Sequence, residues 1–179
     1  IDFPKWLNNL KKTADHGLGQ QIVTMRRNSG CNVNIKDDCQ INMEIKADLI
    51  APCGMNCGIC LGYLREKRHC PGCRSENTEK MVSCQRCSIK NCELLAQTKS
   101  GFCYECPKYP CRRLKQLDVR YRTKYTMSMI ENLENIRNNG ITVFTERENK
   151  RWCCSNCGGL ICVHRGHCYA CGAKPAEPS

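Results

Sequence analysis

Apolar residues in the second half of the chain recur at steps of three and four, which is the spacing of an amphipathic helix. One run begins at Leu114 and predicts a helix with a basic surface over residues 111–121. A second run begins at Ile130 and predicts a helix over residues 129–138. The pattern therefore predicts a helical connector in this part of the chain.

The ends of the second helix carry capping signals. Ser128 and Glu131 have the spacing of a capping box, and Asn139-Gly140 supplies a glycine that can adopt the left-handed conformation after a helix. The secondary structure of residues 141–150 is ambiguous, because Ile-Thr-Val-Phe favours a strand and the charged residues that follow favour a helix.

The first part of the chain shows little periodicity. A short helix over residues 4–13 would place three apolar residues on one face, but polar residues dominate the remainder. We expect residues 1–42 to be a poorly organised N-terminal extension, and Met43 to be the natural start of the protein.

Aliphatic burial alone is too small to stabilise this chain. Leu, Ile, Val and Phe together number 33 of 179 residues and the formal net charge is +11, which is a composition typical of disorder. The chain has an unusually high number of cysteines, 19, which could stabilise the fold instead. Residues 1–30 contain no apolar core of a secretory signal, and the longest uncharged stretch is shorter than the ~18 residues of a membrane span. We therefore expect a cytoplasmic protein without membrane contact, in which dense cysteines favour metal ligation over disulfides.

Two Cys-x2-Cys pairs near the C-terminus form the strongest motif. Cys154 and Cys157 are followed, after ten residues, by Cys168 and Cys171. Each pair lets two thiolates approach one ion from the same side, and the glycine after each pair permits the positive φ of such a turn. Because four thiolates around Zn(II) leave no open position, we predict a structural zinc ribbon over residues 151–174, with a tight hairpin between the pairs.

Four further residues beside the ribbon are potential ligands, but each has a simpler interpretation. We expect Cys153 and Cys162 to pack as small apolar residues, and His164 and His167 to be solvated in a basic loop.

Eleven cysteines lie between Cys53 and Cys111, and their spacing predicts two ligand sets. The first set is Cys57, Cys60, Cys70 and Cys73, and the second is Cys87, Cys92, Cys103 and Cys106. Cys53 and Cys111 remain further candidate ligands, and Cys84 lies outside both sets.

Zn(II), with two to four ions in the chain, is the favoured metal. The alternative for the central cysteines is an iron–sulfur cluster, because Cys103-x2-Cys106-Pro107 with Cys111 close behind is similar to ferredoxin ligand runs. The unbroken ferredoxin run C-x2-C-x2-C-x3-C-P is absent.

The central segment resembles an uncharacterised, cysteine-rich family of prokaryotic proteins that is common in anaerobic archaea and bacteria. The matching motifs are Cys53-Gly54-Met55-Asn56-Cys57-Gly58-Ile59-Cys60, Cys70-Pro71-Gly72-Cys73, Cys87-Ser88-Ile89-Lys90-Asn91-Cys92, Cys103-Tyr104-Glu105-Cys106-Pro107 and Tyr109-Pro110-Cys111. The helix from Met129 and the ribbon that begins at Trp152 also look similar, so the resemblance extends over about residues 43–172. It implies a metal-stabilised module but no function, because the family's own role is unassigned.

A basic segment from Lys99 to Lys124 is a candidate nucleic-acid surface, with tyrosines between its cations. The candidate contacts are Lys108, Arg112, Arg113, Lys115, Arg120, Arg122 and Lys124. The equally weighted alternative is a solvated helix face, with Tyr121 and Tyr125 in the core. Each four-thiolate zinc site also carries a local charge of −2, which weakens the argument from net charge.

The sequence thus predicts a small α+β metal-stabilised fold. It comprises the N-terminal extension, an irregular cysteine-rich module with short helices over residues 43–111, the helical connector over residues 112–150, and the zinc ribbon. No phosphate loop or nucleophile–base pair is recognisable, so no catalytic residue is predicted. We expect a zinc-binding interaction module for nucleic acid, a ribonucleoprotein or a protein partner. The alternative is an iron–sulfur electron-transfer protein with a structural zinc ribbon.

Overall fold

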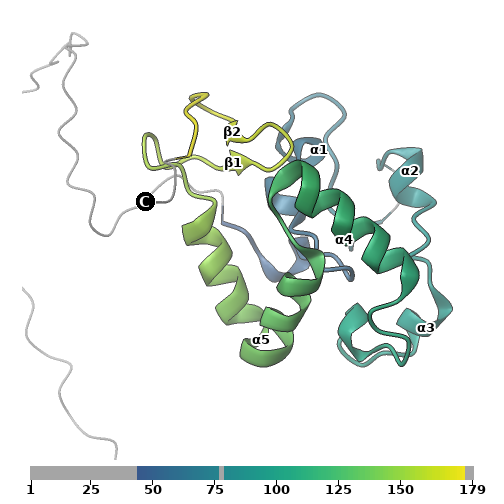
Figure 1. The fold of residues 1–179 in the computed structure, drawn as a ribbon. Coiled ribbons are helices and arrows are strands. Elements are labelled where there is room, and N and C mark those ends of the chain that lie inside the picture. Colours follow the sequence, from purple (N-terminus) through teal and green to yellow (C-terminus); the bar gives the residue numbers. More distant parts are fainter. Residues whose placement is uncertain (1–43, 77–78, 176–179) are drawn as a thin grey trace, which may run out of the picture. The chain divides into compact units, whose positions relative to one another are not determined.

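The computed structural model describes residues 44–76 and 79–175 (Figure 1). The predicted extension over residues 1–42, with its helix over residues 4–13, lies outside the described residues. Short helices alternate with the cysteines of the central module: η1 (Ala47–Leu49), η2 (Cys57–Ile59), α1 (Leu61–Leu64), α2 (Val82–Gln85), α3 (Glu93–Ala96) and η3 (Cys103–Glu105).

The predicted basic helix is confirmed as α4 (Arg112–Tyr125), which is longer than expected. It ends at Thr126, whose φ of 49° is left-handed, and the chain then turns into α5 (Met129–Arg151). α4 and α5 pack against each other, and a buried carboxylate holds the turn between them. Asp118 accepts hydrogen bonds from the Ser128 hydroxyl at 2.8 Å and from the Ile130 N–H at 3.0 Å.

The capping signals at both ends of residues 129–138 are confirmed. The Ser128 hydroxyl accepts a hydrogen bond from the Glu131 N–H at 3.0 Å, and Gly140, with φ 81° and ψ 162°, interrupts the helix. Residues 141–150, whose sequence is ambiguous between strand and helix, continue as helix beyond this break. Phe144 and Glu148, four residues apart, are both buried, so tertiary packing selects helix over strand here.

The tight hairpin predicted between the C-terminal cysteine pairs is also confirmed. β1 (Ile161–Cys162) pairs antiparallel with β2 (His167–Cys168), with Ile161 opposite Cys168. The hairpin lies beside the start of the cysteine-rich module, because the Val163 N–H donates to the Ile59 carbonyl at 3.0 Å. Figure 1 shows the two strands close to α1.

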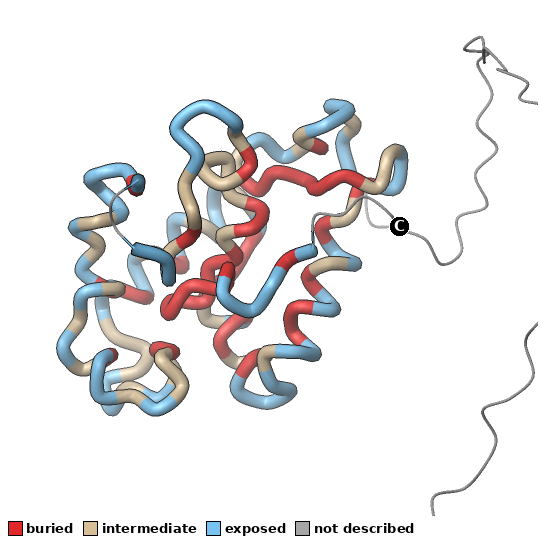
Figure 2. Tube along the Cα trace, turned by 180° about the vertical axis from the view of Figure 1, so that it is seen from behind, coloured by how far each residue is buried: buried red, intermediate tan, exposed pale blue. Residues whose placement is uncertain are grey.

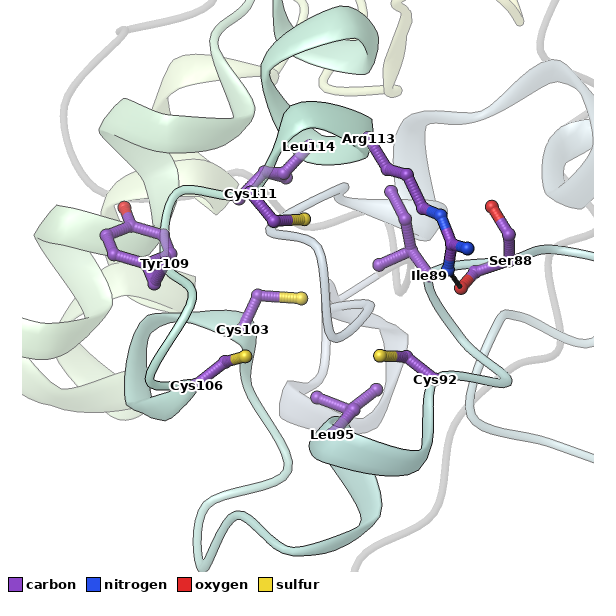
Figure 3. A pocket seen from close by; sticks show the side chains of 10 residues that line it. All are labelled: Ser88, Ile89, Cys92, Leu95, Cys103, Cys106, Tyr109, Cys111, Arg113 and Leu114. Atoms are coloured by element: carbon purple, nitrogen blue, oxygen red, sulfur yellow. Dashed lines mark hydrogen bonds between the residues drawn. The ribbon is translucent and has the colours of Figure 1, made fainter.

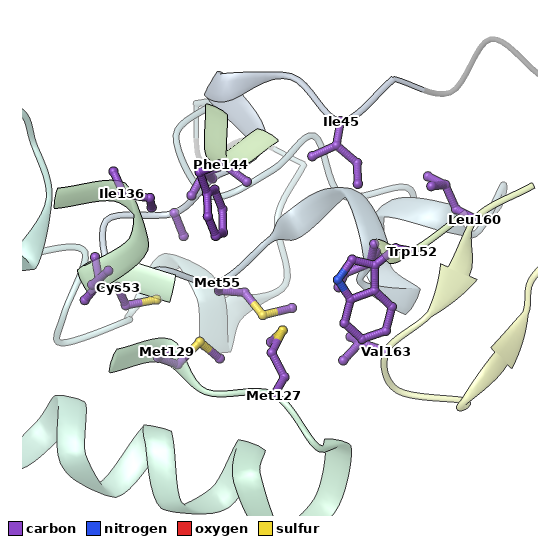
Figure 4. Close-up of a cluster of buried hydrophobic side chains, with 14 of the residues drawn as sticks. Ile45, Cys53, Met55, Met127, Met129, Ile136, Phe144, Trp152, Leu160 and Val163 are labelled. Atoms are coloured by element: carbon purple, nitrogen blue, oxygen red, sulfur yellow. The ribbon is translucent and has the colours of Figure 1, made fainter. Parts of the chain in front are cut away.

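One cluster of buried side chains draws on all three parts of the described chain. Met55 comes from the cysteine-rich module, Met129 and Phe144 from the connector, and Trp152 and Val163 from the ribbon (Figure 4). Figure 2 shows that the buried positions follow the inner sides of these elements. Residues 51–56 are all buried, so the first cysteine motif is part of the core rather than a surface loop.

These observations confirm the predicted fold class. The described residues form α-helices, one two-stranded sheet and a C-terminal cysteine cluster compatible with a metal-stabilised fold. Within the same residues, every helix is too short or too polar to cross a membrane.

Candidate metal centre

The four cysteines of the predicted ribbon converge on one point. The sulfur atoms of Cys154, Cys157, Cys168 and Cys171 all lie within 4.8 Å of one another. The Cys154 and Cys171 sulfurs are 3.7 Å apart, and the Cys157 and Cys168 sulfurs 3.5 Å apart. A tetrahedral zinc ion with Zn–S bonds of ~2.3 Å holds its sulfurs about 3.8 Å apart. The thiols are therefore placed at nearly the separation that a single ion requires.

Two similar turns produce this arrangement. The Gly158 N–H donates to the Cys154 carbonyl at 2.8 Å, and the Gly172 N–H donates to the Cys168 carbonyl at 3.0 Å. Gly158 and Gly172 have φ values of 72° and 75°, as the motif predicts. Each turn presents its two thiols on one side, and the hairpin brings the two turns face to face.

Hydrogen bonds favour the thiolate form at the open edge of the site. The Asn156 side chain donates to the Cys171 sulfur at 3.5 Å, and together with the Ala173 N–H it lowers the pKa of Cys171 to about 6. The Gly159 N–H acts in the same sense on Cys157, but hydrogen bonds shared with the neighbouring thiols raise the pKa of Cys157 to about 12. The hydrogen bonds at this edge therefore favour the thiolate form of Cys171, which is the form that binds a metal ion.

The residues beside the quartet only partly match expectation. Cys162 is fully buried in the core, as predicted. The prediction that His164 is solvated is wrong, because its ring bridges three elements. The His164 Nδ1 accepts from the Leu61 N–H at 3.3 Å, and its Nε2 lies 3.2 Å from the Tyr121 hydroxyl. Burial lowers the pKa of His164, which favours the neutral ring that this bridge requires.

The thiols of the first predicted set of central cysteines influence one another, and the Cys60 thiol is among those that raise the pKa of Cys57. Burial raises the pKa of the Cys57 thiol, and the adjacent Cys73 and Cys53 thiols add to the shift. Burial also raises the pKa of the Cys60 thiol, and here the Cys70 thiol contributes. Among the described residues, the group of potential ligands whose atoms converge closely enough to hold a single ion is the ribbon quartet. Ligation by this first set therefore stays a prediction.

The second predicted set is rearranged in one position. Cys92, Cys103 and Cys106 line a cavity of about 40 Å³, and the fourth cysteine on its wall is Cys111 (Figure 3). Cys87 is not on the wall of this cavity, although its thiol adds to the rise that burial causes in the pKa of both Cys73 and Cys103. Cys84 is exposed.

The predicted nucleic-acid contacts are exposed, and most of them lie on α4. Two of them have structural partners. Arg122 donates to Asp118 at 2.8 Å, and Arg113 donates to the Ser88 carbonyl at 3.1 Å. The remaining exposed cations are Lys108, Arg112, Lys115, Arg120 and Lys124.

A buried polar network near the ribbon was not predicted. The carboxylate of Glu148 accepts from the Asn56 side chain at 2.9 Å and from the Trp152 indole N–H at 3.0 Å. The Asn56 amide oxygen in turn accepts from the Gly58 N–H at 3.0 Å. The network joins the first cysteine motif to the end of α5. The asparagine between two motif cysteines is the only sequence signal that could have indicated it.

Comparison with known proteins gives one match. Residues 49–116 match the model of a family described as a protein of unknown function (DUF3795). The match confirms the resemblance carried by the cysteine motifs, and it ends within the first turns of α4, before the ribbon. No curated protein and no solved structure matches the chain.

Proposed function

We propose that this chain is a zinc-binding interaction protein, in which a closed structural Zn(II) in the ribbon supports the basic helix α4 as a nucleic-acid-binding surface. The convergence of four thiols within 4.8 Å carries the proposal for zinc. Four thiolates fill the tetrahedral shell of the ion and leave no position for a substrate, so the ion has a structural role.

The ribbon supports α4 through the aromatic side chains on its inner face. The His164 ring lies 5.9 Å from the Tyr121 ring and 4.9 Å from the Tyr125 ring, centroid to centroid. His164 lies two residues after the end of β1, so the position of the hairpin determines the position of this contact. An ion that orders the hairpin therefore also fixes the C-terminal half of α4.

The outer face of α4 presents cations to solvent. Arg112, Lys115, Gln116 and Val119 line one shallow depression along the helix, and the Val119 side chain is 60% exposed. The two tyrosines that could stack on bases face His164 instead. We therefore expect the surface to bind phosphates with little dependence on base sequence.

Metal analysis tests the zinc proposal. The purified full chain is expected to lose one zinc per molecule on Cys157→Ser, because three thiolates hold the ion far more weakly than four. Cys84→Ser, at an exposed thiol, is the matched control and is expected to keep the full zinc content. Unchanged zinc in Cys157→Ser, or iron in the ribbon, contradicts the proposal.

A salt titration tests the nucleic-acid surface. Binding of a labelled single-stranded RNA and of a duplex DNA of equal length is measured by anisotropy at several salt concentrations. Replacing Arg112 and Lys115 by Gln removes two phosphate contacts, so the slope of log K against log salt is expected to fall by about 1.4 for single strands. The control replaces Arg147 and Lys150, exposed cations on α5, by Gln. Equal effects of the two double variants, or no binding at low salt, exclude α4 as the surface and leave a protein partner as the alternative.

A further inference from the structure

A second group of four thiols surrounds a cavity in the cysteine-rich module. Figure 3 shows the sulfurs of Cys92, Cys103, Cys106 and Cys111 directed toward the same space. The cavity has a volume of about 40 Å³. This site is separate from the ribbon, whose ligands come from the other end of the chain.

Helix ends hold each of these cysteines in place. Cys92 precedes α3 and Cys111 precedes α4, while Cys103 begins η3 and Cys106 follows it. The Leu95 N–H donates to the Cys92 carbonyl at 3.0 Å, and the Lys115 N–H donates to the Cys111 carbonyl at 3.0 Å. The Cys106 N–H donates to the Cys103 carbonyl at 3.1 Å. These hydrogen bonds fix the main chain at the ligand-bearing positions around the cavity.

The remaining walls of the cavity are mostly apolar. Ile89 and Leu95 are each 8% exposed, and Leu114 is completely buried. Arg113 lies at the rim, where its guanidinium donates to the Ser88 carbonyl. Apolar walls of this kind limit the contact of a sulfur-rich group with water, and one positive charge at the rim offsets part of the negative charge that four thiolates bring.

The size of the cavity distinguishes this site from the ribbon. Four sulfurs around a single zinc ion lie about 3.8 Å apart and almost touch, so no further group fits among them. The ribbon sulfurs have this spacing, with separations of 3.5 and 3.7 Å. A cavity needs roughly 10 to 15 Å³ to admit one water-sized probe, so about 40 Å³ accommodates a group of several atoms. The multi-atom inorganic group that proteins hold with four cysteine thiolates is the iron–sulfur cluster.

We propose that Cys92, Cys103, Cys106 and Cys111 ligate an iron–sulfur cluster, while the ribbon holds zinc. This assignment replaces Cys87 of the predicted set by Cys111. It is independent of the nucleic-acid surface and of zinc in the ribbon, so the chain would carry two metal centres of different chemistry.

The full chain, purified without oxygen and supplied with ferric iron, a thiol reductant and sulfide, provides the test. Iron, sulfide and zinc per chain are measured together with visible absorption. The expected result is iron and sulfide in equal amounts beside one zinc, with a coloured protein. Cys111→Ser is expected to lower the iron and sulfide content while the ribbon zinc stays, and Cys84→Ser is expected to change neither.

Thiol alkylation followed by mass spectrometry gives a second measurement on the unmutated protein. The four proposed ligands should resist alkylation in the loaded protein and react after the iron is chelated, whereas Cys84 should react in both states. Protein that takes up zinc but no iron overturns the cluster. Loaded protein in which Cys111 reacts freely, or a Cys111→Ser variant with unchanged iron, overturns the ligand set.

Discussion

Glu148 is the most informative single position for testing how the fold is held together. Its carboxylate is 3% exposed and accepts hydrogen bonds from Asn56 and Trp152, as described above. Arg151 lies 3.7 Å from the other carboxylate oxygen. Replacing Glu148 by Ala removes the shared acceptor and leaves two buried N–H donors without a partner.

The expected loss follows from counting these donors. An unpaired buried donor costs about 1 to 3 kcal/mol, so Glu148→Ala should lower the free energy of unfolding by about 2 to 6 kcal/mol. Glu148→Gln keeps a side-chain oxygen as acceptor and nearly the same volume, so its loss should be about 1 kcal/mol. The two variants separate the hydrogen-bonded network from simple side-chain packing.

The same carboxylate makes a contribution that depends on pH. Burial raises the pKa of Glu148 above its usual 4.5, so the folded protein retains this proton at pH values where the unfolded chain has released it. Stability from this group therefore falls as pH rises from about 4.5 through the raised pKa, and Glu148→Gln should remove that fall. Comparing wild type with Glu148→Gln at each pH cancels the pH dependence of metal binding, which both proteins share.

Urea denaturation of the metal-loaded full chain, followed by far-UV circular dichroism, measures these differences. The reasoning is refuted if Glu148→Ala unfolds within about 0.5 kcal/mol of wild type, which is the usual range of a surface substitution. It is also refuted if Glu148→Gln destabilises the protein as much as Glu148→Ala does.

Three further predictions concern the turns, the connector and the ribbon. Gly54→Ala should destabilise the protein by more than Gly140→Ala, because a Cβ at Gly54 would lie 2.6 Å from the Met129 carbonyl oxygen, whereas nothing lies within 4 Å of a Cβ at Gly140. Both glycines have a positive φ, so the difference between the two variants in urea denaturation measures the effect of the clash alone. Asp118→Asn should cost about 2 kcal/mol in the same assay, through its charged hydrogen bonds. Although burial opposes it, these hydrogen bonds and Arg122 keep the pKa of Asp118 below 3.8, so the stability that Asp118 contributes is present above that pH and is lost as pH falls through the lowered pKa. Zinc chelation should abolish the chemical-shift dispersion of the ribbon in NMR spectra, and native dispersion that survives chelation would exclude a structural ion.

Local signals in the sequence were sufficient for the elements that depend on neighbouring residues. The Ser128 cap, the break at Gly140 and the two cysteine turns of the ribbon each arise within a few residues, and each is found as predicted. The convergence of the four ribbon thiols follows for the same reason, since each turn supplies two thiols and the hairpin that joins the turns is short.

Features that depend on distant segments could not be predicted in the same way. Cys87 and Cys111 both have acceptable spacing for the second ligand set, and only the packing of α4 against the module places Cys111 at the cavity. The bridging role of His164 depends on Tyr121 and Leu61, which are 43 and 103 residues away in the chain. The sequence of the basic loop around His164 does not indicate these distant partners, so it predicts a solvated histidine.

The first cysteine motif connects the metal chemistry with the core, and this explains how a chain with few aliphatic residues folds. Met55 and Ile59 lie between the motif cysteines, and both are buried in the core. Ile59 also accepts the hydrogen bond from Val163 that docks the ribbon. Because the same short segment contacts the core, the central thiols and the ribbon, ordering of one of these parts lowers the entropic cost of ordering the others. If the ribbon holds an ion as proposed, its removal should therefore loosen the central module as well.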